Sequence, residues 1–154
     1  MKAKDIMSSK VITISPDSGI GEAAKLISMK SVSGLVVVED ENPIAVISES
    51  DIVKGMISDK KKVKDVMDKD FLAVSPLTDF SDLSMHARQK KIKRFPVVDN
   101  KRLVGLVTEI DIIEATRDFT KAHTLVQDSI LAAFGLATIF FLFYYSPLWK
   151  IIFG

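Results

Sequence analysis

Short apolar runs separated by polar turn residues predict a mixed α/β fold over most of this chain. The runs Val11–Ile14, Leu35–Val38 and Ile44–Ile47 are brief and rich in β-branched residues, which favours buried strands. Between the first two runs the apolar spacing changes to i, i+3, i+4, i+7, which is the spacing of a helix with one buried face. The residues in that spacing are Ile20, Ala23, Ala24 and Ile27.

Polar residues between these runs predict where each element ends and the next begins. Ser15 and Pro16 close the first strand, because proline cannot donate to a β-ladder. Asp17 and Ser18 are then available as N-caps for the helix. The cluster Asp40–Pro43 is typical of a turn, so the second and third strands are expected to form a hairpin.

The same pattern occurs twice along the chain. Lys4 and Lys64 lie 60 positions apart, and this offset holds without a gap as far as Ile52 and Ile112. The sequence therefore carries a duplicated unit that reads β-α-β-β-α. One unit alone would leave its sheet half covered, so the two repeats are expected to pack face to face around a shared core.

Each third strand leads directly into a polar corner at the start of a helix. Thr108 and Asp111 form this corner in the second repeat, and Ser48 and Asp51 take the same places in the first. The hydroxyl and free backbone N–H groups at a helix start can face an anion, while the carboxylate can accept hydrogen bonds from sugar hydroxyls. The same residues also satisfy the [ST]-x-x-[DE] capping box, so a purely structural capping role is the competing interpretation.

Composition excludes several classes of function. The chain has 21 Lys and Arg against 20 Asp and Glu, so its net charge gives no support for nucleic-acid binding. It has no cysteine, which excludes disulfides and thiolate metal sites. His86 and His123 stand alone without a second ligand at metal-binding spacing, so no metal site is expected. No apolar core follows Met1, so no cleaved signal peptide is expected.

The motifs of common enzyme classes are also missing, so no catalytic residues are expected. The sequence contains neither a Gly-x-Ser-x-Gly elbow nor a Walker-type glycine loop. Asp51 and Asp111 at polar helix starts are expected to remain ionised rather than to act as general acids. The chain is therefore interpreted as a binding module and not as an enzyme.

Two basic segments carry further predictions. Residues 58–62 contain three consecutive lysines and are interpreted as a solvated connector between the repeats, with contact to a phosphate or an anionic lipid as the alternative. Residues 88–94 span the predicted end of a helix, so part of their positive charge complements the helix C-terminus. Lys93 and Arg94 are candidates to reach a ligand phosphate across the interface between the repeats.

Four motifs follow one another in the second repeat: Lys-Asp-Val-Met, Val-Ser-Pro, Arg-Phe-Pro-Val-Val-Asp and Leu-Val-Gly-Leu-Val-Thr-Glu-Ile-Asp. Together they resemble the cystathionine β-synthase (CBS) domain, and two in tandem resemble a Bateman module, over about residues 1–116. The resemblance implies two β-α-β-β-α repeats packed sheet to sheet with pseudo-two-fold symmetry, and modules that often pair as flat homodimers. It also implies two clefts between the repeats that bind AMP, ADP, ATP or S-adenosylmethionine, with no cofactor.

The resemblance assigns roles to individual positions. The ribose-binding aspartates are Asp51 and Asp111, and the phosphate-facing hydroxyls are those of Ser48 and Thr108. Adenine in such modules lies against the first strand and the start of the second. The positions implicated in this way are Thr13 and Gly34 in one cleft, and Ala73 and Pro96 in the other.

Two departures separate the repeats from each other. The glycine that the family has before the hydroxyl is Gly105 in the second repeat but Ala45 in the first. The proline of the second strand is Pro96 in the second repeat but Val36 in the first. The second repeat is therefore the more typical of the family, and its cleft is the stronger candidate.

An uncharged segment near the C-terminus predicts a membrane-spanning helix. No charge occurs from Ser129 to Pro147, a segment of about 19 residues or roughly 28 Å of helix, close to the hydrocarbon thickness of a bilayer. It is apolar on every side, which fits lipid better than a globular surface. An interfacial belt at its end is predicted from Tyr144, Tyr145 and Trp149, with Lys150 able to reach the head groups.

The charges beside this segment predict its orientation. Arg117, Lys121 and His123 precede it and only Lys150 follows it, which places the repeats in the cytoplasm and a single C-terminal anchor in the membrane. The alternative is a buried helix that joins two modules or fills a groove, which would leave the whole chain cytoplasmic.

The predicted organisation is a first repeat (residues 1–57), a linker (58–63), a second repeat (64–116), a connecting helix (117–128), a transmembrane helix (129–149) and a tail (150–154). The leading hypothesis is a regulatory module that binds an adenine nucleotide and signals to a membrane transporter or channel. A ligand-independent dimeric scaffold for such a partner is the second hypothesis, and an ion sensor built on surface carboxylates is the third.

Overall fold

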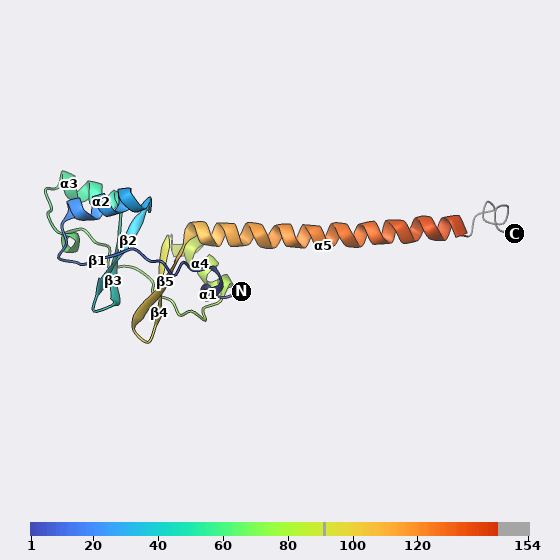
Figure 1. The fold of residues 1–154 in the computed structure, drawn as a ribbon, viewed down its shortest axis with the longest axis horizontal. Coiled ribbons are helices and arrows are strands. Elements are labelled where there is room, and N and C mark those ends of the chain that lie inside the picture. The colour runs from blue at the N-terminus through green and yellow to red at the C-terminus, as the bar shows by residue number, and fades with distance from the viewer. Residues whose placement is uncertain (91, 145–154) are drawn as a thin grey trace. The chain divides into compact units, whose positions relative to one another are not determined.

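A computed structural model describes residues 1–90 and 92–144 of the chain (Figure 1). One compact unit, Met1–Ile113, contains both repeats, and a second unit begins at Glu114. The helix α5, Glu109–Tyr144, is continuous through this boundary. Short helical turns occur at α1, Ala3–Ile6, and at the 3₁₀ helix η1, Val63–Asp65.

The first repeat has the β-α-β-β-α order that its hydrophobic periodicity predicts. Its sheet has the strand order β1-β2-β3, in which β1 pairs with β2 in parallel and β2 pairs with β3 antiparallel. Its two helices supply buried apolar residues to the same core as the strands. The elements are β1, Thr13–Ile14; α2, Ile20–Lys30; β2, Gly34–Glu39; β3, Asn42–Ser48; and α3, Glu49–Ile57.

The second repeat differs from the prediction in its first strand. Only Val74 pairs there, as a single parallel bridge to Val97, so the sheet of this repeat is the antiparallel pair β4-β5. The three residues before Val74 are Phe71, Leu72 and Ala73, none of them β-branched, and they favour an extended ladder less than Val11–Thr13 do. The other elements are α4, Phe80–Lys90; β4, Arg94–Asp99; β5, Arg102–Thr108; and the start of α5.

Both predicted hairpins are confirmed, and their turns are equivalent. Asp40 and Glu41 have φ angles of 49° and 65°, and Asn100 and Lys101 have φ angles of 49° and 66°. Two consecutive left-handed residues define a type I′ turn, whose twist matches that of the flanking strands. The register shifts at the same place in each hairpin, between Val37 and Val38 and between Val97 and Val98.

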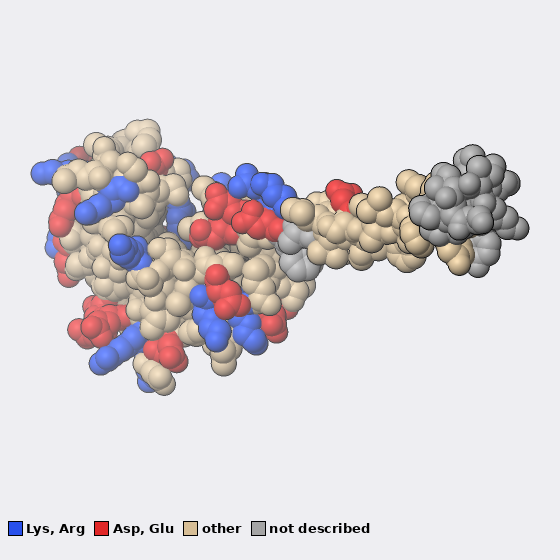
Figure 2. Space-filling model, turned by 45° about the vertical axis from the view of Figure 1, so that its right-hand side comes forward, with Lys and Arg blue, Asp and Glu red and all other residues tan. Residues whose placement is uncertain are grey.

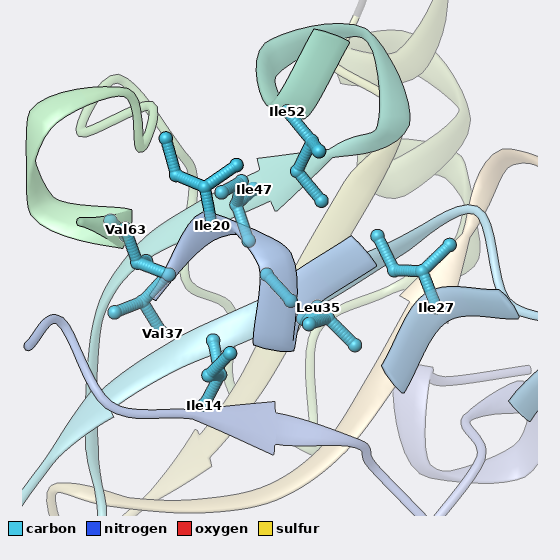
Figure 3. Close-up of a cluster of buried hydrophobic side chains, with 10 residues drawn as sticks. Ile14, Ile20, Ile27, Leu35, Val37, Ile47, Ile52 and Val63 are labelled. Carbon is cyan, nitrogen blue, oxygen red and sulfur yellow. The ribbon is translucent and has the colours of Figure 1, made fainter. Parts of the chain in front are cut away.

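The expectation of one shared core is wrong, because the buried apolar side chains form two clusters, one for each repeat. Figure 3 shows the first cluster, in which strand and helix residues of the first repeat point toward one another. The repeats still meet through their sheets, since β3 contacts both β4 and β5. Val36 and Pro96, at equivalent positions of β2 and β4, are fully buried and belong to neither cluster.

The N-terminal segment of the chain packs on the second repeat rather than the first. Ala3 is fully buried in the second cluster. Its backbone N–H donates to the carbonyl oxygen of Thr78 at 2.8 Å, and the N–H of Phe80 donates to the carbonyl oxygen of Met1 at 3.1 Å. The first residues of the chain therefore complete the fold of the later repeat.

The segment between the repeats packs on the first repeat rather than the second. Val63 is fully buried in the first cluster, and its N–H donates to the carbonyl oxygen of Ser18 at 2.9 Å. The N–H of Ile20 donates to the carbonyl oxygen of Lys61 at 2.9 Å. The end of the predicted linker is thus hydrogen-bonded to the first repeat and is not simply a solvated connector.

The start of α2 departs from the predicted capping. Gly19 occupies the N-cap position without a side-chain cap, so neither Asp17 nor Ser18 serves as the N-cap residue. Instead the carboxylate of Asp17 accepts from Lys64 Nζ at 2.8 Å and from Lys62 Nζ at 3.3 Å. These hydrogen bonds hold the pKa of the Asp17 carboxyl below its usual value.

The helix α5 includes the segment predicted to cross a membrane as far as Tyr144. Tyr145, Trp149 and Lys150, the rest of the predicted belt and anchor, lie outside the described residues. Along the described part, α5 is long and apolar enough for a membrane span by length and composition, and its apolar window is fully exposed. Figure 2 agrees, since the far part of α5 shows almost no charged side chains before the grey atoms begin.

Candidate functional site

The corner at the end of β3 is a complete capping box. The backbone N–H of Ser48 donates to Asp51 Oδ2 at 2.9 Å, and the N–H of Asp51 donates to Ser48 Oγ at 3.3 Å. The Ser48 hydroxyl also donates to Asp51 Oδ2, at 2.5 Å. The predicted capping role is therefore confirmed, and it orients the Asp51 carboxylate through one of its two oxygens.

The corner at the end of β5 repeats this geometry. The backbone N–H and the Oγ1 hydroxyl of Thr108 both donate to Asp111 Oδ2 at 2.7 Å. The N–H of Asp111 donates to Thr108 Oγ1 at 3.3 Å. Within the part of the chain that the structure describes, no donor contacts Oδ1 of Asp51 or of Asp111. In each corner the hydrogen bonds that the described residues donate to the carboxylate therefore all go to Oδ2.

The corner of the first repeat opens into a cavity of about 900 Å³, which we call the first cleft. Its walls come from both repeats, since the segment before α4 and the start of β4 face β3 and α3 across it. The lining residues are Ser33, Val46, Ser48, Glu49, Ser50, Asp51, Asp68, Asp70, Phe71, Leu72, Ile92, Lys93 and Arg94.

The corner of the second repeat opens into a cavity of about 340 Å³, which we call the second cleft. It is formed by the segment before β1 and the start of β2 on one side, and by β5 and α5 on the other. The lining residues are Ser8, Lys10, Val11, Ile12, Ser31, Val32, Ser33, Gly34, Lys93, Arg94, Leu106, Thr108, Glu109, Ile110 and Asp111.

The two clefts are related by the 60-residue offset of the repeats. Every residue that lines the first cleft has its counterpart among those that line the second, from Val46 and Leu106 to Phe71 and Val11. The duplication seen in the sequence therefore produces two equivalent cavities. Each cavity combines one polar corner with a wall from the other repeat.

The structure brings some of the predicted site residues together and leaves others apart. Gly34 lines the second cleft, and Lys93 and Arg94 line both. Thr13 and Ala73 are exposed and line neither cleft. Pro96 is fully buried and also lines neither.

The apolar wall that sequence reasoning assigned to these positions lies slightly earlier in the chain. Val11 and Ile12 line the second cleft, and Phe71 and Leu72 line the first. These pairs precede Thr13 and Ala73 directly. Because successive residues of an extended segment face opposite sides, a shift of one position decides which side chain reaches a cavity.

Arg94 lies between the two clefts. Its Nη2 donates to the backbone carbonyl oxygen of Ser33 at 2.5 Å and to Ser33 Oγ at 2.8 Å. Burial lowers the pKa of the Arg94 guanidinium, while the charges of Asp51 and Glu49 oppose this shift. A guanidinium nevertheless stays protonated in proteins, so Arg94 supplies a fixed positive charge to both clefts.

The absence of a side chain at Gly34 makes room for Arg94. A Cβ atom at Gly34 would lie 2.7 Å from Arg94 Cζ and 2.6 Å from the carbonyl oxygen of Ile47. Gly34 and Arg94 occupy equivalent positions of β2 and β4. The two positions lie so close together that only one of them has room for a side chain.

Sequence reasoning missed several charged residues of the clefts. Lys10 lines the second cleft, and Asp68 and Asp70 line the first. None belongs to a motif, and each lies on a segment that crosses to the other repeat. The 60-residue offset was the available signal, because it pairs Asp70 with Lys10 and Asp68 with Ser8.

The CBS domain profile matches residues 3–58 and 63–118, which together make up most of the chain. The chain therefore belongs to the CBS domain family, and it carries two CBS domains in tandem, as the motifs predict. Over 114 residues it is 35% identical to an inosine-5′-monophosphate dehydrogenase of Methanocaldococcus jannaschii. That match covers 73% of this chain but only 23% of the dehydrogenase, so the chain spans about a quarter of that relative.

Solved structures of CBS domain pairs share the fold. The CBS domain pair of protein MJ0100, in complex with 5′-methylthioadenosine and S-adenosyl-L-methionine, matches with a TM-score of 0.70 and 26% identity, covering 77% of this chain and 97% of that chain. The structure of CBSX2 in complex with AMP matches with a TM-score of 0.69 and 26% identity, covering 77% of this chain and 98% of that chain. The predicted mixed α/β fold of a CBS pair is thus confirmed.

Proposed function

We propose that this chain is a non-catalytic regulatory module that binds an adenine nucleotide, or S-adenosylmethionine, in one or both clefts. The observation that carries the proposal is the pair of equivalent cavities, each with a hydroxyl–aspartate corner beside it. Similar CBS pairs in complex with AMP and with S-adenosyl-L-methionine support the choice of ligand class.

The residues of each cleft supply the three kinds of contact that such a ligand needs. The free Oδ1 atoms of Asp51 and Asp111 accept hydrogen bonds from ribose hydroxyls. Lys93 and Arg94 provide positive charge for phosphate, and Arg94 presents a planar fork suited to phosphate oxygens. The apolar pairs Val11–Ile12 and Phe71–Leu72 offer a surface for the adenine ring.

Ligand-induced stabilisation tests the proposal. We expect at least one of AMP, ADP, ATP and S-adenosylmethionine, at ten times its Kd, to raise the stability of the full chain in detergent micelles by about 1.4 kcal/mol. This corresponds to a rise in melting temperature of roughly 5 °C, measured by differential scanning calorimetry. Guanine and uridine nucleotides of the same charge serve as controls. If none of the four adenosine compounds shifts the transition, the nucleotide-binding function is refuted.

We propose further that α5 anchors the module in a membrane, with the repeats on the cytoplasmic side. The support is the exposed, uncharged surface of α5 beyond Asp128, which is the last charged residue of the described helix. In water, an apolar surface of this extent would associate with other apolar surfaces, whereas lipid covers it without a protein partner.

Extraction of membranes tests the anchor. We expect the full chain to stay with the membrane pellet in alkaline carbonate and in high salt, because a spanning helix is held by hydrophobic burial and not by charge. A chain truncated after Thr116 is the control and should be found in the soluble fraction. Release of the full chain by carbonate would contradict a membrane span and favour the buried-helix alternative.

Regulation requires that the ligand bind two arrangements of the module with different affinity. The homodimer remains a prediction, and so does a transporter or channel as the membrane partner. The ligand-independent scaffold is the competing function. It is distinguished by the calorimetric experiment, because a scaffold is indifferent to nucleotides.

A further inference from the structure

Two equivalent positions give the clefts opposite charges. Asp70 lines the first cleft, and its counterpart in the second cleft is Lys10. Asp68 lines the first cleft, and its counterpart is the uncharged Ser8. The clefts are therefore lined by equivalent positions but differ in the charge that they present to a ligand.

These residues are held in the same place in both clefts. The backbone N–H groups and carbonyl oxygens of Asp68 and Val46 are hydrogen-bonded to each other at 2.8 and 2.9 Å. Ser8 and Leu106 are joined in the same way, with both distances 3.0 Å. Each bridge involves the residue two positions before the hydroxyl of a polar corner. The backbone pairing is therefore the same in both clefts, and only the side chains differ in charge.

The first cleft is acidic on balance. Among the residues the structure describes, it is lined by the four carboxylates of Glu49, Asp51, Asp68 and Asp70 against two cations. The carboxylates do not form a metal site, since no group of three or more metal-ligating side chains converges among the described residues. Asp68 Oδ1 accepts from the backbone N–H of Asp70 at 2.9 Å, which fixes the turn that carries both residues.

The second cleft is basic on balance. Of its described lining residues, Lys10, Lys93 and Arg94 are cations and only Glu109 and Asp111 are anions. A phosphate is therefore bound more favourably in the second cleft than in the first, where the four carboxylates outnumber Lys93 and Arg94.

We propose that the two clefts select different classes of adenosine ligand. The second cleft takes a phosphorylated adenosine such as AMP, and the first takes an adenosine whose 5′ substituent is neutral or cationic, such as S-adenosylmethionine. Asp70 and Lys10 are the residues that set this difference. The inference rests on the proposed function, because it assigns ligands to the same two clefts. The module would then respond to two different ligands rather than to one ligand bound twice.

The test reverses the charge at Lys10 or at Asp70 in a chain in which the corner aspartate of the other cleft is replaced by alanine. Lys10→Asp is combined with Asp51→Ala, so that binding reports on the second cleft. Asp70→Lys is combined with Asp111→Ala, so that binding reports on the first. The two single corner variants are the references. Binding of AMP, adenosine and S-adenosylmethionine to the full chain in detergent micelles is measured by titration calorimetry at about 0.05 and 0.5 M salt.

We expect Lys10→Asp to raise the Kd of the second cleft for AMP about tenfold, and Asp70→Lys to lower the Kd of the first cleft for AMP about tenfold. Asp70→Lys should also raise the Kd for S-adenosylmethionine, which carries a net positive charge. Adenosine is uncharged, so its Kd should change less than twofold. All effects on charged ligands should shrink at the higher salt concentration, which a structural role of these residues would not produce.

Two results would overturn the inference. If either exchange leaves the Kd for AMP unchanged while adenosine still binds, the charge assignment is wrong and the nucleotide-binding function stands. If either exchange changes the Kd for adenosine as strongly as that for AMP, the residue acts through structure and not through charge. Absence of binding by all three compounds to the chain without substitutions would refute the proposed function and the inference with it.

Discussion

Replacing Asp111 with alanine is expected to raise the Kd of the second cleft for its adenosine ligand roughly 100-fold, or about 2.7 kcal/mol. The Oδ1 atom that has no donor among the described residues is the acceptor we assign to the ribose hydroxyls. A hydrogen bond to a charged group contributes about 1.5–3 kcal/mol, so losing one such bond accounts for the effect. Titration calorimetry with AMP on the full chain measures it.

Two control variants separate binding from capping. Asp111→Asn keeps a side-chain acceptor for the N–H of Thr108, so the capping box survives while the negative charge is lost. It should retain the stability of the unsubstituted chain and still bind AMP more weakly. Asp51→Ala is the matched change in the first cleft and should leave the Kd of the second cleft for AMP unchanged. A folded Asp111→Ala protein with unaltered affinity would show that the corner is only a helix cap.

The second large effect is expected at Gly34, where alanine should lower the free energy of unfolding by about 2–3 kcal/mol. The added Cβ would lie 2.6 Å from a backbone oxygen of Ile47, which cannot move without disturbing the ladder between β2 and β3. It would also displace Arg94 from its hydrogen bonds to Ser33. The measurement is the calorimetric melting temperature of the full chain, which should fall by roughly 10 °C.

Gly105→Ala is the matched control for this change. A Cβ atom there would lie 2.5 Å from Met7 Sδ, near the end of a flexible side chain that can turn away, and 3.2 Å from the backbone oxygen of Ser8, a looser contact than the 2.6 Å to Ile47 at Gly34. The equivalent position of the first repeat is already Ala45, which is fully buried in its core. The cost should therefore stay below about 1 kcal/mol. Equal losses at Gly34 and Gly105 would show that the close approach of Arg94 to Gly34 has no energetic weight.

The parts of the fold that the sequence predicts are those set by local pattern. The hairpins follow from apolar runs joined by Asp40–Pro43 and Asp99–Lys101, and the corners follow from a hydroxyl three positions before an aspartate. Both signals act within a few residues, where the chemistry of turns and caps is decisive. Because the repeats are 60 residues apart, each of these predictions for one repeat applied to the equivalent residues of the other.

The parts that the sequence did not predict depend on contacts between distant segments. Thr13 and Ala73 were expected in the clefts, but the faces of the extended segments are set by packing between the repeats, which places Ile12 and Leu72 there instead. The single bridge at Val74 likewise reflects weak local β-propensity that tertiary contacts did not override. Lys10 and Asp70 belong to no motif, so the sequence relates them only through the 60-residue offset, and the structure shows that each lines a cleft.

The reciprocal placement of Ala3 and Val63 has a consequence for how this protein can be divided. Each repeat borrows part of its hydrophobic core from the stretch of chain that introduces the other, so a cut between residues 58 and 63 would yield two incomplete halves. Neither repeat therefore has a complete hydrophobic core without the segment that precedes the other, although the sequence shows two copies. A single repeat could complete its core only with the leading segment of a second molecule, so separated repeats are expected to associate.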